Sequence, residues 1–270
     1  MSGEWESARV AAVEANVEVR RLRTLAAADE AMAVMRETWG DNQTVPRELL
    51  RAFEASENLL QGAYRSGAMV GFALGFFGRD DDGFNLHSHM LAVMPDLRTS
   101  GVGYALKLAQ RAAVAETGVK RIRWTFDPLV ARNAYFNLTK LGAVADGFER
   151  DFYGDMDDTL NAGERSDRLM VRWDVTDGAE RAPSGADPAS GFQVLGLAGD
   201  VAMPNPSSVR PPPADGLAVA RIPADYAVLR EQDPALGATW REAVAIAMEA
   251  CFAAGLVASE FTRDSVYLFR

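Results

Sequence analysis

The chain has 270 residues, of which 48% are hydrophobic, and its formal net charge at pH 7 is −10. This composition is typical of a globular protein, and the acidity argues against nucleic acid or an anionic membrane surface as a main partner. No apolar stretch approaches the roughly 18 residues of a transmembrane helix. The single cysteine, Cys251, excludes an internal disulfide and lies in an apolar helical pattern, so we expect it to be buried and unreactive.

The amino-terminal part of the chain alternates strand and helix patterns. We expect residues 1–16 to be a loose lead-in or a short helix, without the basic and apolar regions of a signal peptide, hence a cytoplasmic protein. Alternation and turn residues predict strands at 17–22, 59–65, 68–77, 84–93, 121–126, 143–153 and 168–175. Helical spacing predicts helices at 26–38, 46–56 and 131–141, and another that begins at Val102 and is closed by Gly118.

The composition changes after residue 175. Small and polar residues at 176–193 predict a linker, and five prolines within 203–216 exclude a helix or a central strand there. A strand at 217–222, a helix beginning at Pro223, a helix opened by Asp233-Pro234 and a hairpin at 256–261 and 265–269 complete a small α+β extension, residues 194–270. We expect this extension to pack on the domain at 17–175, as one wall of a substrate cleft or as a dimer contact.

The most informative stretch is the turn between the strand at 84–93 and the next helix. Residues 98–103 read Arg-Thr-Ser-Gly-Val-Gly, and the helix then carries apolar residues spaced 4, 3 and 4 apart. Such a turn suits a phosphate or pyrophosphate for three reasons. The helix start has unpaired N–H groups, the glycines have no Cβ atoms, and Arg98 adds a positive charge. The turn matches neither a Walker loop nor a dinucleotide fingerprint. The alternative is that its glycines only permit a tight bend.

The spacing Arg-x-x-Gly-x-Gly after Leu-Ala-Val-x-Pro resembles the acyl-CoA motif of the GCN5-related N-acetyltransferase (GNAT) superfamily. The resemblance covers about residues 17–175. Residues 125–144 further resemble a bacterial branch whose members carry an appended carboxy-terminal segment. The resemblance implies an α/β GNAT fold, a mixed, mostly antiparallel sheet with helices on both faces, followed here by the α+β extension.

The resemblance also implies acetyl-CoA as the donor and direct acetyl transfer to a primary amine of a small molecule. In this superfamily the strands at 84–93 and 121–126 splay apart, and the pantetheine arm enters the gap. The cofactor-binding residues expected from this are Leu91, Ala92, Val93, Arg98, Thr99, Ser100, Gly101, Val102, Gly103, Tyr104 and Asn133.

Two histidines are candidates for the general base. His87 and His89 lie two apart on the motif strand, so we expect them to share a face, and a base with a reference pKa of about 6.5 suits proton removal near neutral pH. The alternative is that both are structural. Asp127, at the end of the next strand, could face the substrate amine or cap its own turn.

The general acid is less clear, because the superfamily's usual tyrosine position is occupied here by Leu138. Tyr135 and Tyr153 are substitutes, and water could also protonate the thiolate. Two other functions therefore stay open: a non-catalytic acyl-CoA-binding or sensing module, and an acyltransferase that uses a longer acyl-CoA. We expect no metal ion, no nucleic acid and no membrane partner, and a homodimer is the candidate assembly.

Overall fold

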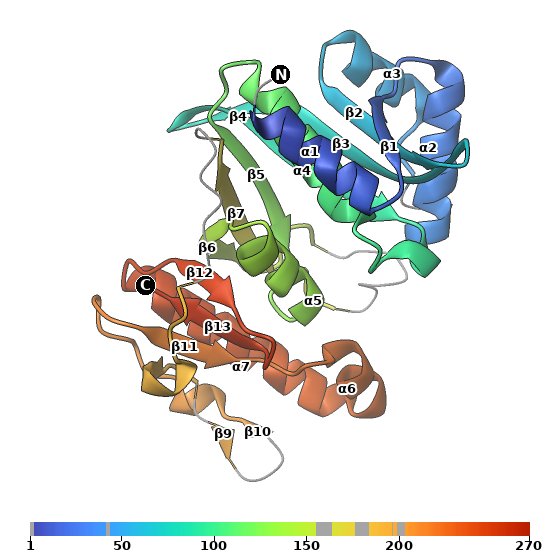
Figure 1. The fold of residues 1–270 in the computed structure, drawn as a ribbon. Coiled ribbons are helices and arrows are strands. Elements are labelled where there is room, and N and C mark those ends of the chain that lie inside the picture. The colour runs from blue at the N-terminus through green and yellow to red at the C-terminus, as the bar shows by residue number, and fades with distance from the viewer. Residues whose placement is uncertain (1–2, 42–43, 155–163, 176–183, 196, 199–202) are drawn as a thin grey trace. The chain divides into compact units, whose positions relative to one another are not determined.

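The computed structural model describes residues 3–41, 44–154, 164–175, 184–195, 197–198 and 203–270 (Figure 1). These residues divide into two compact units. The first unit contains the described chain through Trp124, together with Glu164 and residues 174–175, and the second unit contains the remaining described residues.

The sheet of the first unit has the strand order β1-β2-β3-β4-β5. Neighbouring strands are antiparallel except β4 and β5, which are parallel. The strands are β1 (Glu18–Arg21), β2 (Leu59–Arg65), β3 (Ala68–Asp80), β4 (Gly83–Val93) and β5 (Arg121–Phe126), of which the last two residues belong to the second unit. The mixed, mostly antiparallel sheet predicted from the sequence is confirmed.

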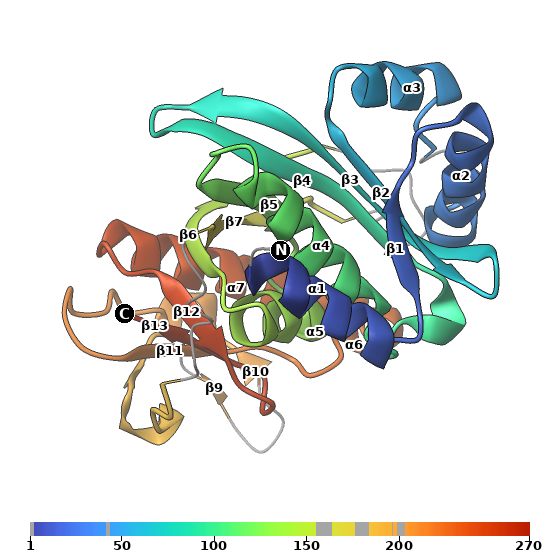
Figure 2. The same ribbon diagram turned by 45° about the horizontal axis from the view of Figure 1, so that its top comes forward.

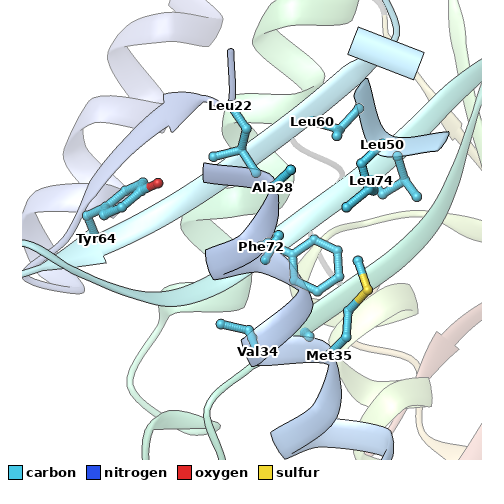
Figure 3. Close-up of a cluster of buried hydrophobic side chains, with 11 residues drawn as sticks. Leu22, Ala28, Val34, Met35, Leu50, Leu60, Tyr64, Phe72 and Leu74 are labelled. Carbon is cyan, nitrogen blue, oxygen red and sulfur yellow. The ribbon is translucent and has the colours of Figure 1, made fainter. Parts of the chain in front are cut away.

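Helices cover both faces of this sheet, as predicted. Helices α2 (Leu25–Trp39) and α3 (Arg47–Ala55) pack on one face, where their apolar side chains join those of β2, β3 and β4 in a buried cluster (Figure 3). Helix α4 (Val102–Ala115) packs on the other face, where Val102 and Leu106 approach the backbone of β3 at Gly71. The burial of these two apolar helix faces holds the unit together.

The β2–β3 hairpin turns at the predicted dipeptide. Ser66 and Gly67 have φ values of 51° and 84°. Positive φ at both central residues is the backbone of a type I′ turn, whose twist matches that of the flanking strands. The turn sets the first pairs of the hairpin, through Tyr64, and a bulge then shifts the register before Phe72 pairs with Gly62.

Residues 3–14 form a helix, α1 (Gly3–Glu14), so the second of the two expectations for this segment is confirmed. Figure 2 shows it lying along α4. The two helices are antiparallel, because Glu4 pairs with Arg111 at 3.1 Å and Trp5 donates to Glu116 at 2.6 Å, whereas Ala15 lies beside Gly101. Helix α4 is therefore enclosed between the sheet and α1.

The second unit has its own sheet segment, with the strand order β7-β6-β12-β13-β11-β8, and a separate pair β9-β10. Its strands are β6 (Val144–Glu149), β7 (Arg168–Asp174), β8 (Phe192–Gln193), β9 (Leu197–Ala198), β10 (Met203–Pro204), β11 (Ala218–Arg221), β12 (Ala258–Phe261) and β13 (Val266–Phe269). Its helices are α5 (Ala131–Ala134) with the π-helix Tyr135–Lys140, α6 (Tyr226–Gln232) and α7 (Pro234–Ala253). The α+β character and the closing hairpin of the extension are confirmed.

Several expected boundaries changed. The strand expected at 143–153 ends at Glu149, and the helix expected at 131–141 becomes a π-helix after its first turn. The expected linker lies partly outside the described residues, which omit 176–183. Cys251 is fully buried, and burial raises the pKa of its thiol to about 12, which fits the expected lack of reactivity. None of the described helices is both long and apolar enough to span a bilayer.

Asp233 caps α7 as the sequence predicted. Its side chain accepts a hydrogen bond from the N–H of Leu236 at 2.9 Å, and Pro234 occupies the first helical position. We expect Asp233→Ala to lower the free energy of unfolding by about 1 kcal/mol, since an orphan N–H of the first turn loses its acceptor. Urea denaturation measures this change. The control is Asp215→Ala, at an exposed aspartate in the loop before β11. Equal stability losses in both variants would contradict the capping role.

Candidate active site

The turn between β4 and α4 presents backbone amides without a side-chain cap. Gly101 occupies the cap position with φ of 86°, a left-handed conformation that disfavours residues with a Cβ. The first hydrogen bond of the helix runs from the N–H of Ala105 to the carbonyl of Gly101 at 3.0 Å. The amides of Val102 and Gly103 precede that bond and so have no acceptor within the helix. This is the arrangement that binds phosphate groups at helix starts.

The predicted residues around this turn divide into two roles. Arg98 and Thr99 are exposed, and Gly101 and Gly103 are half-buried. Ser100 instead closes the turn, because both its N–H and its hydroxyl donate to the carbonyl of Leu97, at 3.1 and 2.8 Å. The turn itself is therefore held by Ser100, and the surface it offers consists of Arg98, Thr99 and the amides that follow.

The end of α1 borders the turn. A Cβ built on Gly101 would lie 3.5 Å from that of Ala15. Arg65 donates to the carbonyl oxygens of Ala15 and Asn16 at 2.7 and 3.3 Å, so a guanidinium satisfies the carbonyl end of this segment. Because that end of a helix carries partial negative charge, Arg65 also offsets it beside a site suited to an anion.

Strands β4 and β5 separate soon after they begin to pair. Their parallel ladder contains the pairs Leu86 with Ile122 and His87 with Arg123, and among the described residues no pair follows. We call this point, after His87 and Arg123, the fork. Beyond it, residues 91–93 bond to β3 on one edge of β4, and no described strand pairs with their other edge. The predicted splay is therefore confirmed, and it leaves main-chain groups to which an extended ligand can bond.

A β-bulge lies next to the fork. Met90 pairs with Leu74 and Ser88 with Gly75, so His89 is an extra residue on β4. Bulges bend a strand and change which side its residues face. On one side of the bulge Ser88 contacts α4, whereas on the other side Met90 packs against the cluster formed with α2 and α3.

His87 and His89 share a face, as expected. Their ring centroids lie 5.8 Å apart, and both rings contact Phe76, which stacks on Phe53 of α3. Burial, with smaller contributions from the charges of His89 and Lys107, lowers the pKa of His87 to about 4, and burial also lowers the pKa of His89. Both imidazoles are therefore neutral at pH 7, but His87 is a weaker base than an ordinary histidine.

Lys107 was not among the residues predicted from the sequence. Its ammonium donates to the hydroxyl of Ser88 at 2.8 Å and lies 3.7 Å from the ring centroid of Trp124. The side chain is 3% exposed, and burial lowers its pKa to about 7. The signal was a lysine between the apolar residues Leu106 and Leu108, but it reads as a solvent-facing residue unless Ser88 and Trp124 are known to face it.

The other expected residues belong to the second unit. Tyr135 begins the π-helix, with the guanidinium of Arg263 lying 5.6 Å from its ring centroid, and Asn133 is half-buried in α5. Tyr153 is 41% exposed and shares a hydrogen bond of 3.2 Å with Thr125. Their placement as substitutes for the usual tyrosine stays a prediction.

Leu138 and Asp127 have structural surroundings. Leu138, at the position of the superfamily's tyrosine, is 1% exposed. Asp127 accepts from the N–H of Leu129 at 2.8 Å and from both terminal nitrogens of Arg241 at 2.7 and 2.9 Å. Of the two expectations for Asp127, the turn cap is the one confirmed.

Comparison with known families decides the assignment. Residues 25–142 match the model of the acetyltransferase (GNAT) family. Residues 25–142 are therefore assigned to the GNAT superfamily. The matched residues include the motif turn, the fork and both histidines, so the resemblance stated from the sequence is confirmed at the level of the superfamily.

Solved GNAT structures are similar to part of this chain. The ribosomal-protein-S18-alanine N-acetyltransferase of Escherichia coli is 17% identical, with 62% of this chain and 99% of that chain covered and a TM-score of 0.48. The yncA protein of Salmonella typhimurium, solved with acetyl-CoA as its cofactor, is 16% identical, with 63% of this chain and 99% of that chain covered and a TM-score of 0.48. A phosphinothricin acetyltransferase of Sinorhizobium meliloti, solved with AcCoA, is 15% identical, with 65% and 97% covered and a TM-score of 0.49. A comparison with curated proteins gave no match.

Proposed function

We propose that this GNAT protein is an N-acetyltransferase that moves the acetyl group of acetyl-CoA directly to a primary amine of a small molecule. The observation that carries the proposal is the succession of two binding features along the chain: the free edge of β4 at residues 91–93 and the uncapped amides after Gly101 at the start of α4. The first suits an extended amide-bearing arm and the second a pyrophosphate. Together they fit the two halves of a CoA molecule.

The candidate cofactor-binding residues of the first unit then have separate tasks. Arg98 and the amides of Val102 to Tyr104 bind the pyrophosphate, while Ser100 and Gly101 shape the turn. A main-chain N–H between Leu91 and Val93 donates to the thioester oxygen as it gains charge during attack. Such preorganised donors lower the barrier because they need no rearrangement as the charge develops.

The histidines are the proposed bases. Because both are neutral at pH 7, either can accept a proton from the attacking amine, directly or through water. His89 is the better candidate, since its ring is the more exposed one and the pKa of His87, about 4, makes it a weak base. In the second unit, Tyr135 is the residue proposed from the sequence to protonate the CoA thiolate. Asn133, in the same unit, is proposed to contact the cofactor.

Binding of CoA to the wild type and to Gly101→Trp tests the proposal. We expect the variant to bind at least about thirtyfold more weakly, because the side chain would occupy the phosphate-binding turn and strain a left-handed residue, which costs about 1–2 kcal/mol. The matched control is Gly118→Trp: Gly118 also has a positive φ, 78°, but has open space around it. Isothermal titration calorimetry and thermal melting measure both variants.

Two results would contradict the cofactor assignment. One is a wild type that gives neither heat nor a thermal shift with millimolar CoA. The other is equal weakening of CoA binding by both substitutions, which would attribute the effect to backbone strain and not to the turn as a binding site.

One observation favours a second function, acyl-CoA binding without catalysis. The position of the superfamily's tyrosine holds a buried leucine, Leu138. Release of free thiol from acetyl-CoA in the presence of a panel of amines separates the two functions: an enzyme releases thiol in proportion to the amine consumed, whereas a sensing module binds CoA and releases none.

A further inference from the structure

We propose that Lys107 is a catalytic residue of this transfer, the acid that protonates the sulfur of CoA as the thioester breaks. The inference rests on the proposed function. It adds a residue outside the motif that carries the family resemblance, and it assigns the role of the acid to Lys107 of the first unit in place of Tyr135.

Both strands of the fork contact the Lys107 ammonium. The last pair of the β4–β5 ladder is His87 with Arg123, and the next residue on each strand, Ser88 and Trp124, lies against Nζ at 2.8 and 3.7 Å. A hydroxyl oxygen and the face of an indole ring are both favourable partners for a cation. The amine is therefore fixed at the point where the two strands separate.

The proposed path of the cofactor ends at the same point. An arm that starts at the amides after Gly101 and follows the free edge of β4 passes Val93 and Leu91 before it reaches Ser88. Leu91 is the residue nearest to Ser88 in the stretch proposed to bind the thioester oxygen, three residues of strand away, or about 10 Å. The oxygen therefore binds at Leu91 when the sulfur faces Lys107. The reactive end of the arm thus approaches Lys107, whereas the adenosine end stays beside the motif turn.

The surroundings suit an amine that changes its protonation state. Among the described residues no carboxylate pairs with Lys107. The charged or titratable groups near it are His87 on β4, which is neutral at pH 7, Arg123 on β5, which pairs with Asp80 at 2.9 Å, and Arg111 on its own helix, bound to a carboxylate of α1. Burial brings the pKa of Lys107 to about 7, below the roughly 8.5 of an ordinary thiol, so proton transfer to a thiolate is favourable.

The proposed step replaces one carbon–sulfur bond with one carbon–nitrogen bond and moves two protons. The acceptor nitrogen forms a bond to the thioester carbonyl carbon, and the carbon–sulfur bond breaks with its electron pair on sulfur. Lys107 Nζ gives one proton to that sulfur and becomes a neutral amine, while the acceptor nitrogen loses one proton to the base or to water. Lys107 regains a proton from solvent after the product leaves.

Three variants test this role. Lys107→Met removes the positive charge and keeps a similar side-chain volume. Lys107→Arg keeps a positive charge but does not release its proton near pH 7. The control is Lys120→Met, at an exposed lysine. We expect both Lys107 variants to lose about 10²-fold in kcat, with KM for acetyl-CoA changed by less than threefold, and the control to resemble the wild type. Thermal melting and CoA titration verify that each variant is folded and binds.

The pH dependence gives a sharper test. A general acid must be protonated, so the ratio of wild-type kcat to Lys107→Met kcat should fall as pH rises through the lysine's pKa. Taking the ratio cancels the ionisation of the acceptor amine, which affects both proteins equally. A ratio that is constant with pH would overturn the proposal. So would a result in which Tyr135→Phe, and not Lys107→Met, abolishes the fall of kcat at alkaline pH.

A binding measurement tests the contact with sulfur without turnover. If Lys107 faces the sulfur, the wild type should bind CoA more tightly than desulfo-CoA while Lys107 is protonated, and this preference should fall as pH rises through the lysine's pKa; Lys107→Met should bind the two equally. Equal binding by the wild type at every pH contradicts the inference even if acetyl transfer is confirmed. Absence of CoA binding or transfer in the wild type contradicts the proposed function itself.

Discussion

Phe72→Ala is expected to lower the free energy of unfolding of the first unit by about 3–5 kcal/mol. Phe72 is 1% exposed on β3, and its ring makes an edge contact with Trp39 of α2 at 6.2 Å between centroids. It joins side chains of α2, α3 and β2, so truncation leaves a cavity bordered by three elements that cannot all collapse into it (Figure 3). Urea denaturation measures the change.

A phenylalanine on the neighbouring strand is the matched control for this substitution. Phe84 on β4 is 66% exposed. Phe84→Ala should change the free energy of unfolding by less than about 1 kcal/mol, as surface substitutions usually do. Comparable losses in Phe72→Ala and Phe84→Ala would show that the cluster on the α2 and α3 face is not the core of the unit.

Asp127→Ala is expected to cost the second unit about 3–5 kcal/mol. The side chains of Asp127 and Arg241 are 12% and 7% exposed, and two hydrogen bonds join them. Removing the carboxylate takes two hydrogen bonds and a neighbouring negative charge from the buried guanidinium of Arg241. The N–H of Leu129 loses its acceptor as well.

The double variant Asp127→Ala with Arg241→Met tests the cause. If an uncompensated charge dominates, removing the arginine too should recover part of the loss, so the double variant is more stable than Asp127→Ala alone. The exposed pair Glu6 and Arg9 provides the comparison, and Glu6→Ala should leave the stability nearly unchanged, because solvent screens that pair. A double variant less stable than the single one would contradict this explanation.

The sequence predicted those parts of the fold that depend on local chemistry. Ser66-Gly67 specifies its turn through positive φ, and Asp233-Pro234 specifies a helix start through a cap and a missing N–H. These signals need only a few neighbouring residues. The π-helix after Ala134 and the enclosure of α4 by α1 depend on distant contacts, so the pattern of single residues does not reveal them.

The candidate site was predictable to the same extent. The amides after Gly101 follow from a motif, but the bulge at His89 does not, because it depends on how β4 pairs with β3. Across the bulge, even-numbered residues change sides: Ser88 contacts α4, whereas Met90 contacts the α2 and α3 cluster. An alternation count along the strand therefore cannot assign its faces. Lys107 was missed for this reason too, since its partner is Ser88.

The helix that precedes the first strand also determines where this domain can be cut for expression. A fragment that begins with β1, at residue 18, would lack Glu4 and Trp5 and would expose the guanidinium of Arg111, now 4% accessible, together with an apolar strip of α4. Newly exposed apolar surface favours aggregation. Fragments for crystallisation or NMR should therefore begin before Gly3, although the match to the family begins only at residue 25.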